Sequence, residues 1–306
     1  MNYQSLTRPF FRALVMALVL LPATTAIAAT NVVVSLKPLE LLVRAVATED
    51  TTVTTLVGPG ANPHNYSMKP SQRRALADAN AIFWVGPEME TFLARLLTSG
   101  EFHARSHAFM PDEVADNHSK EGHHHQHDSH NGESGNSGSD PHVWLDPATS
   151  LDMAREIHSV LKALPGADRA ALEANLVAFE RSLAVAEKEI RQQLEPARAL
   201  SLFTYHDAFS HFARHYDLPL AGVLTLNPEL SPGARHIAEV QDRLRKATRP
   251  CLMTERPFDQ SSWKPITGDI AVTFSDWDPL ASDIEADSAG YLAFQRSVAE
   301  AVLGCL

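Results

Sequence analysis

Short apolar runs rich in β-branched residues alternate with helical stretches in both halves of the chain. The runs predict strands at Val32–Val34, Val53–Val57, Ile82–Val85, Leu202–Tyr205, Leu220–Leu224, Cys251–Thr254 and Ile270–Phe274. The stretches between them predict helices near Pro38–Ala47, Pro70–Ala79, Glu88–Leu97, Asp207–Tyr216, Gly233–Ala247 and Gly290–Leu303. Such alternation indicates parallel strands joined by helical crossovers. The predicted fold class is therefore α/β.

A longer helix is predicted between the two halves, over Asp168–Glu195. Its apolar residues recur every three or four positions, at Leu172, Leu176, Phe179, Leu183, Ala186, Ile190 and Leu194. A helix of this length would run about 42 Å at 1.5 Å per residue and could brace two lobes as a rigid spine. A coiled-coil dimer is less favoured, because only about four heptads of mixed apolar residues are present. We expect a first lobe over 30–164, a linking helix within 165–196 and a second lobe over 197–306.

The first 29 residues have the pattern of a cleavable secretory signal peptide. Arg8 and Arg12 precede a short apolar core, and Ala26-Ile-Ala28 resembles a cleavage site. The apolar core is too short for a membrane helix, which needs about 20 residues. We therefore expect an exported, soluble protein.

The chain is acidic, with a formal net charge of −11 that becomes −13 without the two arginines of the signal segment. This balance argues against nucleic acid or an anionic membrane surface as a partner. It is compatible with the attraction of cations. Roughly 275 residues remain after signal removal, a length typical of two domains.

Cys251 and Cys305 are the only cysteines. Two thiols in an exported protein are expected to form a disulfide. Metal ligation is the weaker alternative, because no Cys-x-x-Cys pair is present.

Six of the fifteen histidines lie in one polar segment, at about residues 116–139, among Asp, Glu, Ser, Gly and Asn. They are His118, His123, His124, His125, His127 and His130. A segment without apolar residues cannot offset its ordering entropy by packing, so we expect it to be disordered. Histidine-rich tracts indicate metal binding, and imidazole is a good ligand for Zn²⁺. A purification tag is disfavoured, because the histidines are interrupted by other residues and lie within the chain.

Three other histidines, His64, His142 and His206, stand in segments flanked by Pro or Asp. His64 and His206 each follow a predicted strand, and parallel α/β sheets bind ligands at the carboxyl ends of their strands. We therefore expect the three imidazoles to converge on one metal ion, although any one alone would more often be a packed or surface residue. Asp278 also follows a predicted strand and is the candidate fourth ligand, with turn capping as its alternative role.

Asp207 and Glu255 are candidates to orient an imidazole through its second nitrogen. Glu88 and Glu90 lie in a helical pattern and are expected to be solvated. The other histidines are expected to pack helices or to lie at the surface, namely His103, His107, His158, His211, His215 and His236. His211 and His215 have a spacing that could bind metal on a helix face, but no further ligand accompanies them.

Five motifs are spread over nearly the whole mature chain: Asn62–Ser71, Val85–Glu90, Pro141–Pro147, Tyr205–Ala208 and Asp278–Leu280. Together they resemble the ZnuA-type family, the periplasmic zinc-binding components of ABC importers. The resemblance implies two four-stranded parallel α/β lobes joined by one long rigid helix, with zinc held in the cleft. It also implies the Cys251–Cys305 disulfide.

Motif matching implies that His64, His142 and His206 are the zinc ligands. Some family members have Glu immediately before the first ligand, where this chain has Pro63, so the fourth position stays open between Asp278 and water. Manganese-binding relatives have Glu at the position of His206. Imidazole there favours zinc over a harder ion, without excluding copper, nickel or cobalt.

The expected function is high-affinity capture of Zn²⁺ in the periplasm and its delivery, by a monomer, to an inner-membrane ABC permease. The histidine-rich segment is then a weaker accessory site. A zinc hydrolase is the alternative from another class, since three histidines and water also form catalytic centres. The chain has no H-E-x-x-H or G-x-S-x-G motif, so we do not expect an enzyme. A zinc buffer with the histidine-rich segment as its main site is a second alternative.

Overall fold

The computed structural model describes five stretches of the chain, residues 29–98, 100–110, 140–225, 232–255 and 260–306. The predicted signal peptide, except its last residue, lies outside the described residues, as do all six histidines of the histidine-rich segment. None of the helices within these stretches is both long and apolar enough to cross a membrane.

The first sheet has four parallel strands in the order β2-β1-β3-β4. These are β1 (Thr30–Val34), β2 (Thr51–Thr55), β3 (Ala81–Trp84) and β4 (Ser106–Ala108). The connections contain α1 (Lys37–Val46), α2 (Pro70–Asp78) and α3 (Thr91–Leu97), with 3-10 turns η1 (Pro63–Asn65) and η2 (His103–Arg105). Val33 and Val34 of β1 point to opposite faces and both are buried, because helices cover the sheet on both sides.

The second sheet repeats this topology with the order β6-β5-β7-β8, again all parallel. Its strands are β5 (Ser201–His206), β6 (Leu220–Thr225), β7 (Pro250–Thr254) and β8 (Thr273–Asp276). The helices are α6 (Ser210–His215), α7 (Ala234–Lys246), α8 (Gln260–Thr267) and α9 (Gly290–Leu303). The strand order reverses between β5 and β7, and a crevice opens beyond the carboxyl ends of strands at such a reversal. This edge of the sheet is where a ligand is expected.

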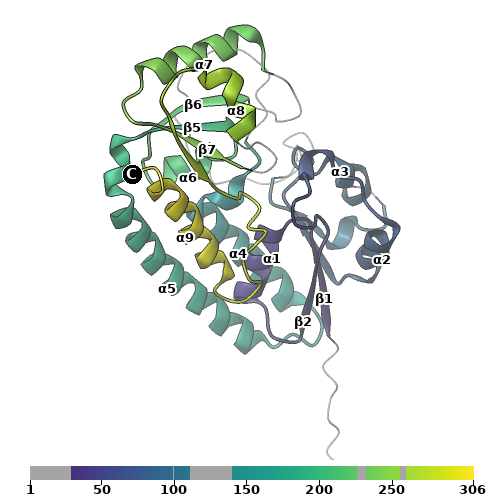
Figure 1. Cartoon of the computed structure of the whole chain (residues 1–306). Helices are drawn as coiled ribbons and strands as arrows, with labels where there is room; N and C mark the ends of the chain where they lie inside the picture. The colour runs from purple at the N-terminus through teal and green to yellow at the C-terminus, as the bar shows by residue number, and fades with distance from the viewer. Residues whose placement is uncertain (1–28, 99, 111–139, 226–231, 256–259) are drawn as a thin grey trace, which may run out of the picture.

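Helices between the two sheets join them into one body (Figure 1). The chain passes from η3 (Val143–Leu145) through α4 (Pro147–Ala163) and α5 (Arg169–Gln193) to η4 (Glu195–Ala199). Helix α1 contacts α4, α5 and α9, and α5 also contacts α4 and α9. One cluster of buried side chains runs through this layer and includes Phe83 of the first sheet and Met253 of the second. The lobes therefore share a core.

The long helix α5 lies along one side of the molecule, reaching from one lobe to the other (Figure 1). Its apolar face is buried, and the Asp168 carboxylate caps its first turn by accepting from the backbone N–H of Ala171 at 3.0 Å. The Asn175 side chain donates to the backbone carbonyl of Ala47 at 2.8 Å, which ties the helix to the end of α1. At the other end of the molecule, Cys251 of β7 is bonded to Cys305 after α9, as predicted, with the Cα atoms 5.9 Å apart.

Several predicted boundaries were wrong. The last strand is Thr273–Asp276 rather than Ile270–Phe274, and α3 begins at Thr91 rather than Glu88. The sequence prediction also lacked β4, α4 and α8. β4 is only three residues long and half-buried, so it carries too little apolar alternation to be recognised.

The prediction that Glu90 is solvated was also wrong, because its carboxyl group is fully buried. It accepts hydrogen bonds from the Ser35 hydroxyl and from the backbone N–H groups of Val85 and Gly86, the latter at 3.2 and 2.9 Å. Burial raises the pKa of Glu90 to about 7, although these hydrogen bonds act in the opposite direction. The residue precedes α3 and closes the turn after β3, which the helical pattern had obscured.

Candidate metal centre

Three imidazoles from distant segments converge beside the carboxyl end of the second sheet. His206 is the last residue of β5, His142 immediately precedes η3, and His64 lies in η1, beyond the loop after β2. One ring nitrogen of each lies within 4.8 Å of a ring nitrogen of each of the others. The structure thus brings together the three histidines that the sequence analysis singled out.

Local turns set the direction of two of these segments. The Asn62 side chain accepts from the backbone N–H of His64 at 3.0 Å, and Pro63 opens the 3-10 turn with its φ already fixed. The Asp140 carboxylate accepts in the same way from the backbone N–H of His142, also at 3.0 Å. In both loops, therefore, the side chain of an Asn or Asp two residues before the histidine fixes the turn by accepting the histidine's backbone N–H.

The separation of His142 and His206 suits a tetrahedral zinc ion. Their Nε2 atoms lie 3.4 Å apart. Two nitrogens that each lie about 2.0–2.1 Å from zinc at the tetrahedral angle are about 3.3 Å apart. The ring centroid of His64 lies 5.5 Å from the ring centroid of His142 and 6.2 Å from the ring centroid of His206, so the third imidazole flanks the pair.

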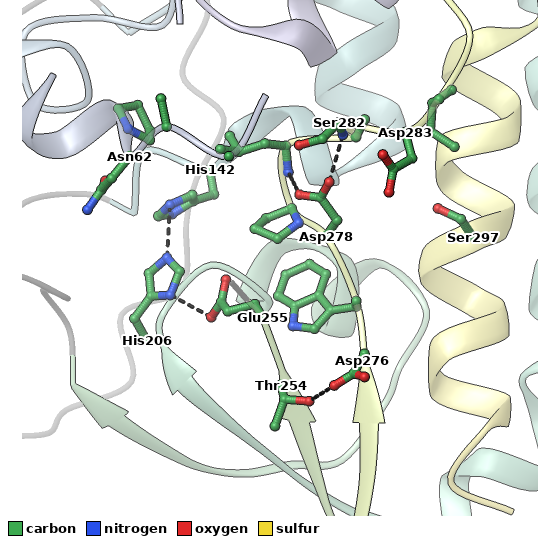
Figure 2. Close-up of a pocket in the computed structure, with 18 of the residues that line it drawn as sticks. Asn62, His142, His206, Thr254, Glu255, Asp276, Asp278, Ser282, Asp283 and Ser297 are labelled. Atoms are coloured by element: carbon green, nitrogen blue, oxygen red, sulfur yellow. Dashed lines mark hydrogen bonds and ion pairs between the residues drawn. The ribbon is translucent and has the colours of Figure 1, made fainter. Parts of the chain in front are cut away.

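A carboxylate holds each of the two buried rings through its other nitrogen. The Nδ1 atom of His142 lies 2.7 Å from Asp140 Oδ1, and that of His206 lies 2.6 Å from Glu255 Oε1. A ring that donates its Nδ1 proton to a carboxylate leaves Nε2 with a free lone pair for a metal. Figure 2 shows the two rings facing each other with Glu255 behind His206. This is the arrangement in which a pair of imidazoles is oriented before the ion arrives.

Burial and charge act differently on the three imidazoles. Burial lowers the pKa of His64 to about 3, and the nearby His142 and His206 add to the effect. Burial also lowers the pKa of His142, although the hydrogen bond that this ring donates to Asp140 acts in the opposite direction. For His206 burial acts downward as well, but the charge and hydrogen bond of Glu255 outweigh it and raise the pKa. His64 and His142 are therefore neutral at pH 7, the state needed for ligation.

Asp278 lies in the same cavity but directs its carboxylate at its own loop. Its two oxygens accept from the backbone N–H groups of Leu280 and Ser282, at 2.8 and 2.6 Å. The side chain thus performs the turn-capping role considered as its alternative (Figure 2). Asp207, the other predicted orienting carboxylate, accepts a hydrogen bond from the Ser210 hydroxyl.

A cavity of about 560 Å³ lies in front of the imidazoles. Its wall includes Glu255, Asp276, Asp278 and Asp283, and Ser297 of α9 lies at its far side (Figure 2). Carboxylates that line a cleft raise the local concentration of cations. The cavity is therefore an electrostatically suitable entrance for a divalent ion.

Sequence reasoning gave Asp140 no role in this region and did not foresee that His211 contacts it. His211 Nε2 lies 3.0 Å from the backbone carbonyl oxygen of Asp140 and 3.3 Å from its Oδ2 atom. The Asp-x-His spacing of Asp140 and His142 was the only local signal. It was hidden because the aspartate directly follows a long polar segment.

The comparisons with known proteins agree with this geometry. A family model described as ZnuA, zinc-uptake complex component A, periplasmic, matches residues 32–305. The high-affinity zinc uptake system protein ZnuA of Yersinia pestis is 31% identical over 293 residues, covering 92% of each chain. The protein of the same name from Haemophilus ducreyi is 30% identical over 318 residues, covering 97% of this chain and 99% of the relative.

Solved structures are similar over the same extent. A crystal structure of ZnuA superposes with a TM-score of 0.67 at 26% identity, covering 90% of this chain and 99% of the other. The periplasmic zinc binding protein TroA from Treponema pallidum gives a TM-score of 0.71 at 19% identity, covering 90% and 98%, which bears on the fold alone. The family model and two relatives of 30% identity or more each span most of the chain, so this protein belongs to the ZnuA family, the periplasmic components of zinc-uptake complexes.

Proposed function

We propose that the chain captures Zn²⁺ in the periplasm with His64, His142 and His206 as ligands, and delivers it to the permease of a zinc ABC transporter in the inner membrane. The observation that carries the proposal is the 3.4 Å separation of two buried, carboxylate-oriented imidazole nitrogens with a third imidazole beside them. The names of the relatives from Y. pestis and H. ducreyi support zinc uptake as the role.

Charge balance favours a divalent cargo at this centre. Asp140 and Glu255 place two carboxylates directly behind the imidazoles, and a dication between the rings offsets both. In the metal-free protein, the raised pKa of His206 favours a protonated ring, and this proton offsets part of the negative charge of Glu255. Zinc binding then displaces this proton, which makes capture weaker at lower pH.

The fourth position belongs to water in this proposal. Both carboxylate oxygens of Asp278 already accept hydrogen bonds from backbone N–H groups, and ligation would require the loop to rearrange. Zinc centres built from three protein ligands keep an exchangeable fourth position. A labile ligand there suits a site that must release its ion.

The proposed role is binding and not catalysis. The family is one of transport components. Turnover of ester, peptide or lactam substrates by the zinc-loaded protein would contradict this part of the proposal.

Residues 1–29 are proposed to be a cleaved signal peptide, consistent with the periplasmic assignment of the family. A monomer is sufficient for the function, because one chain supplies all three imidazoles. The histidine-rich segment is proposed as a weaker accessory site, since it rejoins the described chain at Asp140, two residues before His142.

Replacing His64, His142 and His206 together by alanine tests the assignment of the ligands. The variant should lose tight zinc binding in a calorimetric titration with a competing chelator, while the weaker binding of the histidine-rich segment remains. His103→Ala, which changes an exposed histidine in η2, is the matched control and should bind as the unaltered protein does. Tight stoichiometric binding by the triple variant would overturn the assignment.

A further inference from the structure

Two histidines outside the triad hold the two ends of the loop that carries His142. His211 and His215 lie one helical turn apart on α6, and they contact Asp140 and Asp146, which stand on either side of His142. We propose that His211 and His215 are positioning residues for zinc capture, which fix residues 140–146 against α6 and so set the place of His142 beside His206. The inference rests on the proposed zinc function.

The near end of the loop is held at Asp140. His211 Nε2 lies 3.0 Å from its backbone carbonyl oxygen, so this nitrogen is the donor, and it also lies 3.3 Å from Oδ2. The other carboxylate oxygen, Oδ1, receives the Nδ1 proton of His142. One carboxylate thus joins His211 to His142, and all three side chains are largely withdrawn from solvent. A shift of Asp140 would turn the ring of His142.

The far end of the loop is held at Asp146. His215 Nδ1 lies 3.1 Å from Asp146 Oδ1, and its Nε2 lies 2.7 Å from Glu187 Oε1 on α5. Asp146 also caps α4 by accepting from the backbone N–H of Ala148 at 2.8 Å. His215 therefore joins the start of α4 to the long helix α5. Both partners are carboxylates, so a doubly protonated ring satisfies both contacts.

The middle of the loop is held by the second lobe as well. The indole N–H of Trp144 donates to the carbonyl oxygen of Pro279 at 2.8 Å, and the Tyr291 hydroxyl donates to the carbonyl oxygen of Trp144 at 3.0 Å. Although His142 is followed by helices packed on the first lobe, its loop is anchored by α6, α9 and the segment after β8. His142 and His206 consequently behave as one preformed pair.

The two supporting histidines lie close in sequence to the zinc ligand His206. Residues 206–215 carry one zinc ligand, His206, at the end of β5, followed by both supporting histidines on α6. This short stretch therefore contributes both His206 and two of the contacts that place His142 beside it. Loss of either supporting histidine should loosen that relation while leaving the three ligands present.

The test replaces each supporting histidine in the full mature chain and measures zinc affinity by chelator competition. His211→Leu and His215→Leu remove the contacts. His211→Gln keeps a donor near the place of Nε2, and His215→Asn keeps one near Nδ1. Loss of a group that orients a metal ligand weakens binding by about 10–100-fold, so we expect this for the leucine variants and substantial recovery in the amide variants.

The absorption spectrum of the protein loaded with Co²⁺ distinguishes a change in ligand geometry from a general loss of stability. The d–d bands report ligand geometry, and they should shift in the leucine variants and return towards their original position in the amide variants. His103→Leu is the control. If a leucine variant does not fold, His211→Asn replaces it, because the shorter amide withdraws the donor from Asp140.

The outcomes separate this inference from the function on which it rests. Folded leucine variants with unchanged zinc affinity and an unchanged Co²⁺ spectrum would overturn the positioning role. Failure of the unaltered protein to bind zinc tightly would instead overturn the proposed function. Weaker binding without recovery in the amide variants would also count against positioning, since it would assign the effect to packing.

Discussion

His142 and His206 present their Nε2 atoms to each other at 3.4 Å, although they are 64 residues apart in the chain. Each ring is buried and is backed by a carboxylate on its Nδ1 side. Their spacing is that of two ligands of one tetrahedral zinc ion. The preformed pair is the feature from which the predictions about zinc follow.

Glu255→Gln should weaken zinc binding by about 10-fold, because the amide keeps the size of the side chain but removes the charge that orients and polarises His206. Chelator competition at pH 7 measures the change. The matched control is Glu189→Gln, which removes an exposed carboxylate on α5 that forms an ion pair with Arg296, away from the imidazoles. Equal affinities in the two variants would show that Glu255 does not support the ligand.

Asp278→Ala should leave zinc affinity close to that of the unaltered protein while lowering the stability of the metal-free form by about 1–2 kcal/mol. The reason is that its carboxylate caps the loop at Leu280 and Ser282 and does not occupy the fourth position. Zinc titration and thermal unfolding of the same sample measure the two effects. A large loss of affinity would identify Asp278 as a ligand.

Deletion of residues 118–130 should leave one tight zinc site and remove the weaker ones. Carboxylates orient two rings of the triad, whereas the polar composition of the histidine-rich segment predicts a site that must lose conformational entropy when it binds an ion. Calorimetric stoichiometry before and after the deletion measures the difference. Loss of the tight site would favour the alternative of a zinc buffer.

The buried carboxyl group of Glu90 should make the free energy of unfolding depend on pH. Burial raises the pKa of Glu90 to about 7 from its ordinary value of 4.5, so the folded protein holds this proton more tightly than the unfolded chain. Its contribution is fully present below pH 4.5 and is lost as the pH rises towards 7. The shift corresponds to about 3 kcal/mol.

Thermal unfolding of metal-free Glu90→Gln between pH 4.5 and 8 measures this contribution against the unaltered protein. The variant loses the acceptor of the Gly86 N–H group, so it should be less stable at low pH. The difference in stability between the variant and the unaltered protein should decrease as the pH rises. A constant difference would mean that Glu90 does not titrate in this range.

The α/β class, the buried face of α5 and the convergence of the three histidines could all be predicted from sequence. The first two depend on local periodicity, and the third on histidines that follow a strand or stand in a Pro- or Asp-flanked motif. The contacts of Asp140 with His211 and the burial of Glu90 could not be predicted. Both arise where segments distant in sequence meet, and a helical pattern or a polar segment gives no sign of its tertiary partner. The role of Asp278 was ambiguous for a different reason: an aspartate can either cap a turn or bind a metal ion, and the sequence does not distinguish the two.

Anomalous diffraction at the zinc edge from crystals of the zinc-loaded protein would locate the bound ion. We expect one strong peak about 2.0–2.1 Å from a ring nitrogen of each of His64, His142 and His206, with water as the fourth ligand. A principal peak elsewhere, or one that lacks any of these three imidazoles, would contradict this assignment of the ligands.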